Sequence, residues 1–139
     1  MDVRKEWKLS TDSYYMDGRP TYSEIVAKFG EVLLEESDSD YQGDSLVLLR
    51  KAGRIGHLTF GWGSCSGCDS LEAANTPEEL QGLVDELEAN IRWFDSTAEA
   101  EKFMREHDWE GQFCGDLGKL YAPRAIAMLA ASKEGRDGK

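Results

Sequence analysis

Apolar residues in the second half of the chain recur every three or four positions, which is the spacing of helices that bury one side. Three of the expected helices begin with a hydroxyl residue followed three positions later by a glutamate, a pair that can cap a helix start. These helices are predicted over residues 21–29, 76–91 and 96–107. A fourth helix is expected from near Pro123 through Ala131, and residues 132–139 are expected to form a polar tail.

The first half of the chain favours strands. Apolar runs at residues 45–49 and 55–60 flank a polar segment that contains Gly53, and this arrangement predicts a β-hairpin. Shorter strands are expected at residues 32–34 and 92–94.

Strands that precede helices, without a regular β-α-β alternation, indicate an α+β fold. We therefore expect an antiparallel sheet of about three to four strands, with a hairpin near residues 45–61, packed against about four helices. A chain of 139 residues has the length of one ordinary domain, so residues 1–139 are predicted to form a single globular domain.

The net charge of −11 is concentrated in one segment. Residues 69–110 hold thirteen Asp and Glu against three Lys and Arg, a net charge of −10. Such a surface repels nucleic acid and anionic membranes and attracts basic proteins. We therefore expect a protein partner, for which a basic surface is favoured, and no direct binding to nucleic acid.

No apolar stretch reaches the roughly 18–20 residues that a membrane-spanning helix needs, and the first residues lack the apolar core of a signal peptide. A cytoplasmic location without membrane association is therefore expected. The odd number of cysteines, three, agrees with a compartment in which thiols stay reduced.

The most distinctive motif is the octet Trp62–Asp69, which reads WGSCSGCD and follows an apolar strand. Its cysteines, Cys65 and Cys68, have the C-x-x-C spacing of redox dithiols and of zinc ligands. A zinc site needs two more ligands, and the candidates are Cys114 and His57. The third interpretation is a glycine-rich turn in which both thiols pack as small apolar groups, and this interpretation is preferred.

The octet, together with Tyr41-Gln42-Gly43-Asp44 and Trp93-Phe94-Asp95-Ser96, resembles a family of small uncharacterised proteins encoded by bacteriophages and prophages. The similarity spans about half the chain, from Tyr41 to Trp109. It implies an accessory protein that is made inside the host cell during infection, and it implies no mechanism.

These observations lead to the hypothesis of a non-enzymatic, acidic accessory protein that binds a host or phage protein. No catalytic residue and no cofactor are predicted. The alternative hypothesis is a zinc-binding or thiol-redox protein that uses Cys65 and Cys68. The candidate binding residues are Trp62, Cys65, Cys68, Asp69, Asp85, Glu86 and Glu88.

Overall fold

The computed structural model describes residues 1–9, 18–38, 43–63, 69–109 and 117–137, with side chains as far as residue 131. Its centre is a four-stranded antiparallel sheet in the order β1-β2-β3-β4, the same as the order along the chain. The α+β class and the number of strands predicted from the sequence are thus confirmed. The strands are β1 (Glu31–Ser37), β2 (Gly43–Lys51), β3 (Arg54–Trp62) and β4 (Arg92–Phe94).

The predicted hairpin is formed by β2 and β3. Lys51 pairs with Arg54 at its end, so that Ala52 and Gly53 alone make the turn. Both have positive φ, 52° and 81°, as the favoured two-residue hairpin turns require. This tight turn holds β2 and β3 in register over nine paired residues, from Gly43–Trp62 to Lys51–Arg54.

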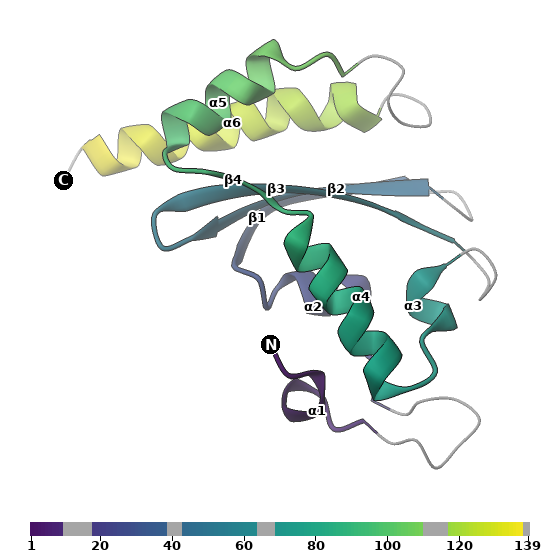
Figure 1. Cartoon of the computed structure of the whole chain (residues 1–139). Coiled ribbons are helices and arrows are strands. Elements are labelled where there is room, and N and C mark those ends of the chain that lie inside the picture. The colour runs from purple at the N-terminus through teal and green to yellow at the C-terminus, as the bar shows by residue number, and fades with distance from the viewer. Residues whose placement is uncertain (10–17, 39–42, 64–68, 110–116, 138–139) are drawn as a thin grey trace.

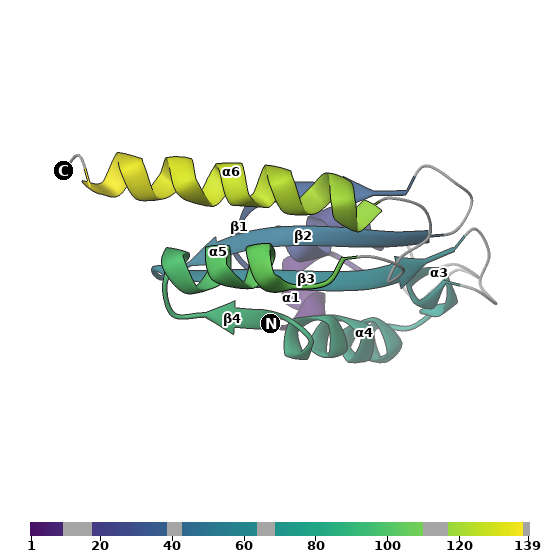
Figure 2. The ribbon, with the colours of Figure 1, turned by 90° about the horizontal axis from the view of Figure 1, so that it is seen from above.

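In the described parts of the chain, six helices cover the two faces of the sheet (Figure 1). On one face lie α1 (Val3–Glu6), α2 (Tyr22–Val26), α3 (Ser70–Ala73) and α4 (Pro77–Ala89). On the other face α5 (Thr97–Glu106) and α6 (Leu117–Asp137) run side by side, as Figure 2 shows from above.

Because the sheet is covered on both faces, β2 contains a continuous run of apolar residues. Val47 and Leu49 point into the core beneath α1 to α4, whereas Leu46 and Leu48 point into the core beneath α5 and α6. Successive side chains of a strand alternate between faces, so a strand that is covered on both sides has no polar face.

The three predicted helix caps are present, since Thr21, Thr76 and Ser96 each accept a hydrogen bond from the backbone N–H three residues on. The expected end of the first of these helices was wrong, because α2 stops at Val26. The short helix α1 was not predicted.

The prediction for the last helix was wrong at both ends. The helix α6 begins at Leu117 rather than near Pro123, and it continues to Asp137 through most of the expected tail at 132–139. Leu117 and Tyr121 are buried against the sheet. Their packing supports a helical turn on the N-terminal side of Pro123, although an internal proline removes a backbone hydrogen bond.

A candidate binding pocket beside the octet

The octet lies at the open end of the β2–β3 hairpin. Its described members are Trp62, Gly63 and Asp69, whereas the thiols of Cys65, Cys68 and Cys114 lie outside the described residues. The redox and zinc interpretations of these cysteines therefore stay predictions. The described ends of the octet show how the segment between them is anchored.

Asp69 anchors the C-terminal end of the octet with a carboxylate that is only 6% exposed. Its Oδ1 accepts hydrogen bonds from the backbone N–H groups of Leu71 (2.8 Å) and Glu72 (3.1 Å), so it caps α3. Its Oδ2 accepts from the backbone N–H of Gly63 at 2.8 Å, and this bond joins the two described ends of the octet.

Tyr22, the first residue of α2, joins this anchor to the sheet. Its hydroxyl donates to Asp69 Oδ1 at 2.8 Å, and its ring lies 4.8 Å from the ring of Phe60 on β3, centroid to centroid. Burial, followed by the hydrogen bond to Asp69, raises the pKa of the Tyr22 hydroxyl well above its ordinary value. The hydroxyl thus stays a donor, and the ring is held in one position.

Trp62 is fixed on the neighbouring side of the hairpin. Its indole N–H donates to Ser45 Oγ at 3.1 Å, and Ser45 Oγ lies 2.6 Å from Ser37 Oγ on β1. Trp62 lines a shallow hollow of about 250 Å³ that also borders Tyr22 and Phe60. The predicted residues Trp62 and Asp69 are therefore both adjacent to the Tyr22–Phe60 ring pair.

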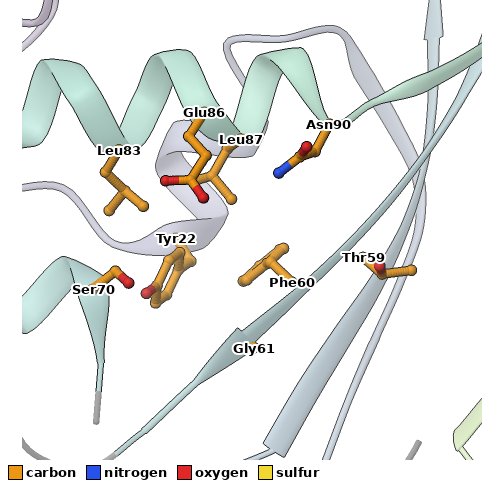
Figure 3. A pocket seen from close by; sticks show the side chains of 9 residues that line it. All are labelled: Tyr22, Thr59, Phe60, Gly61, Ser70, Leu83, Glu86, Leu87 and Asn90. Carbon is orange, nitrogen blue, oxygen red and sulfur yellow. The ribbon is translucent and has the colours of Figure 1, made fainter. Parts of the chain in front are cut away.

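On the other side of this ring pair is a pocket of about 190 Å³ between β3, α2, α3 and α4 (Figure 3). Glu86 and Asn90 reach from α4 toward the rings of Tyr22 and Phe60. We call it the Glu86 pocket. Its lining residues are Tyr22, Thr59, Phe60, Gly61, Ser70, Leu83, Glu86, Leu87 and Asn90.

Among the described residues, Glu86 is the one charged residue that lines the Glu86 pocket, and its carboxylate can only accept hydrogen bonds. In the described part of the chain, the side chains of Glu86, Asn90 and Ser70 make no hydrogen bond or ion pair with another residue. The lining includes no Lys, Arg or His. A carboxylate beside two aromatic rings suits a cation with several N–H donors, such as a guanidinium or an ammonium group.

The three predicted carboxylates of α4 do not form one site. Glu86 faces the pocket, Asp85 accepts a hydrogen bond from Gln81 on the side near the N-terminus, and Glu88 lies beside Trp93 at the turn of the hairpin. Each residue of a helix is rotated by about 100° from the one before, so Glu86 points away from the side of α4 that carries Asp85 and Glu88. Only Glu86 joins Trp62 and Asp69 in this region.

The acidic segment 69–110 also does not form one surface. It crosses the sheet through β4, with α4 on one face and α5 on the other (Figure 1). The helix α4 carries five acidic residues and no basic one, whereas the three acidic residues of α5 are accompanied by Lys102 and Arg105. The side chains of α4 carry a net charge of −5 and those of α5 a net charge of −1, and on α4 Glu78 pairs with Arg4 of α1. The larger negative charge is therefore on the face of the Glu86 pocket.

His57, the histidine of the predicted zinc set, lies on the opposite face of β3. It is 7% exposed, its Nδ1 is 2.9 Å from the hydroxyl of Tyr121, and the rings of Phe103 and Trp109 lie 5.6 and 5.7 Å away. Burial lowers the pKa of His57 to about 4, with smaller effects of the nearby His107 and Arg92. His57 is thus a neutral core residue near pH 7.

Within the described ranges, no group of three or more His, Cys, Asp or Glu is arranged to hold a metal ion. No described helix is long and apolar enough to cross a membrane. No protein-family model, curated protein or solved structure matches the chain.

The sequence indicated Glu86 as a candidate binding residue, but it did not indicate the other residues that line the pocket. Tyr22, Phe60 and Asn90 come from three separate elements, and nothing in their local sequence links them. Only the position of Tyr22 directly after the capping residue Thr21 indicated that its side chain would be fixed at a helix start.

Proposed function

We propose that this chain is a non-enzymatic, phage-encoded accessory protein that binds a basic host or phage protein in the cytoplasm. In this proposal an arginine or lysine side chain of the partner enters the Glu86 pocket. The observation that carries the proposal is the convergence of the Glu86 carboxylate and the Asn90 amide on the rings of Tyr22 and Phe60.

The size of the pocket supports a side chain as its occupant. A volume of about 190 Å³ is smaller than the roughly 300–1,000 Å³ of sites that enclose a whole small molecule. The end of an arginine can lie flat against Tyr22 and Phe60 while its N–H groups reach Glu86 and Asn90. Such a contact combines cation–π attraction with a charge-assisted hydrogen bond.

The charge of α4 supports a basic partner. Glu78 pairs with Arg4, and the other four carboxylates of α4 create a negative potential on this face of the protein. This potential increases the rate at which a basic surface finds the site, and the short-range contacts in the pocket then determine the lifetime of the complex. Binding is accordingly expected to weaken as the salt concentration rises.

The partner can be identified by placing a photo-crosslinking amino acid at Ser70, an exposed residue on the rim of the pocket, and irradiating infected cells. The affinity of the captured protein is then measured with Glu86→Lys. We expect a loss of at least about tenfold, since the variant places like charges in contact. Glu106→Lys on α5 makes the same charge change on the opposite face and should cost less than about twofold.

Equal effects of the two variants, or a captured partner without basic character, would contradict the proposal. The zinc or thiol alternative is separated from it by metal analysis and thiol titration of freshly purified protein. Three free thiols without bound zinc agree with the proposal, whereas stoichiometric zinc that is lost in Cys65→Ser supports the alternative.

A further inference from the structure

The helix α6 has an exposed side that is unusually apolar for this chain. Between Leu117 and Ala131 it contains two charged residues, Lys119 and Arg124, whereas charged residues make up 31% of the whole sequence. Its inner side packs on the sheet, yet Leu120 (45% exposed) and Met128 (38% exposed) face outward. A helix that is apolar on all sides is usually covered on all sides.

A groove of about 440 Å³ lies between α5 and α6, on a side of α6 that does not include Leu120 or Met128. Its floor and walls are mainly apolar and come from both helices and from Trp109, whose indole N–H is held by the carbonyl oxygen of Met104 at 3.0 Å. We call it the α5–α6 groove. Its lining residues are Met104, Arg105, Trp109, Lys119, Ala122, Pro123 and Ile126.

The charged residues that line the α5–α6 groove are both basic, Arg105 on α5 and Lys119 on α6. This sign is opposite to the net charge of −11 and to the charge of α4. The Nε of Arg105 pairs with Glu101 at 3.2 Å, an exposed pair of neighbouring helical turns. Exposed pairs of this kind contribute little to stability, so an incoming carboxylate can share the guanidinium.

We infer that the α5–α6 groove binds a helical segment of a partner protein whose apolar residues are flanked by Asp or Glu. Apolar anchors spaced along one side of that helix would contact Trp109, Pro123 and Ile126, in the manner of helix-in-groove recognition. Its carboxylates would meet Arg105 and Lys119. The charge complementarity of rim and ligand selects this partner over a basic one.

Together with the Glu86 pocket, this groove gives the protein two binding faces of opposite charge on opposite sides of the sheet. The inference does not depend on the proposed function, since no residue lines both the groove and the Glu86 pocket.

The test uses the full-length protein as bait for a displayed library of helical peptides with randomised surface positions. We expect enrichment of peptides with apolar residues at helical spacing and with flanking Asp or Glu. The double variant Arg105→Glu with Lys119→Glu should weaken a selected peptide at least tenfold, and Ile126→Glu should do the same. Val32→Glu introduces the same charge at an exposed apolar residue on β1 and should leave the affinity within twofold.

Several outcomes would overturn the inference: no enrichment, a basic consensus, or peptides whose affinity is unchanged in the rim variant. Sedimentation of the wild-type protein adds a further criterion, because a dimer that Ile126→Glu dissociates would show that a second copy occupies the groove. Glu86→Lys should leave the affinity of the selected peptide unchanged, which separates this inference from the fate of the Glu86 pocket.

Discussion

Asp69 keeps its carboxylate buried while it accepts four hydrogen bonds, three from backbone N–H groups and one from Tyr22. Removal of the carboxylate takes this acceptor from all four donors, and of the three backbone N–H groups Leu71 keeps a bond to the Tyr22 hydroxyl, at 3.2 Å. We expect Asp69→Ala to reduce the free energy of unfolding by about 3 kcal/mol, as measured by urea denaturation. Glu88→Ala removes an exposed carboxylate and should change stability by less than about 0.5 kcal/mol. Equal effects would show that the Asp69 network contributes nothing.

His57 makes stability depend on pH, because its pKa is about 4 in the folded protein and about 6.5 when exposed. Between these values the unfolded chain binds a proton that the folded protein does not. Its contribution is therefore complete above pH 6.5 and is lost as the pH falls, by about 1.4 kcal/mol per pH unit and about 3 kcal/mol by pH 4.

The variant His57→Gln keeps a hydrogen-bonding group near Tyr121 but cannot titrate. Urea denaturation between pH 7 and pH 4 should therefore show a shallower loss of stability in the variant than in the wild type. The carboxylates of the protein titrate in both and cancel in the comparison. Parallel pH profiles would show that His57 is not buried as a neutral ring.

At the scale of elements, two glycines should respond in opposite directions to the same substitution. Gly53 occupies the hairpin turn with φ of 81°, whereas Gly82 lies on the exposed side of α4, and neither has an atom near the position of an added Cβ. Gly53→Ala should lower the free energy of unfolding by about 1 kcal/mol through backbone strain. Gly82→Ala should raise it by about 0.5–1 kcal/mol through helix propensity.

Urea denaturation of the two variants side by side tests this pair. A shift of the same sign in both would mean that the turn or the helix is wrongly assigned. The pair is informative because no side-chain contact is gained or lost at either position.

The elements with local signals were those that the sequence predicted. The turn at Gly53, the capping residues Thr21, Thr76 and Ser96, and the apolar stripe of α4 depend on residues within a few positions of each other. The start of α6 was missed because it depends on the packing of Leu117 and Tyr121 against the distant strands of the sheet. Proline favours the first turn of a helix, so the local sequence indicated a helix start at Pro123 instead.

At the scale of the whole molecule, the sheet separates surfaces that are continuous in sequence. The acidic segment is divided by β4 into α4 and α5, so its total charge overestimates what any one partner meets. The Glu86 pocket, in contrast, brings together residues that are far apart in the sequence. Tyr22, Phe60 and Glu86 meet only in the folded protein. Composition therefore leads to the hypothesis of a basic partner, but it does not indicate where such a partner would bind.

The most direct test of the Glu86 pocket needs no knowledge of the partner. Titration of ¹⁵N-labelled protein with N-acetyl-arginine amide, followed by NMR, should shift the backbone signals of Phe60, Leu87 and Asn90 with a Kd of about 1 mM, or about 4 kcal/mol of binding free energy. N-acetyl-citrulline amide has nearly the same shape without the charge and serves as the control ligand. Glu86→Gln serves as the control protein.

We expect saturable shifts at these three residues with the arginine compound, no shifts with the citrulline compound, and no shifts in Glu86→Gln with either compound. The same shifts with both compounds, or shifts with the arginine compound that persist in Glu86→Gln, would contradict the proposal that the Glu86 pocket binds a cationic side chain.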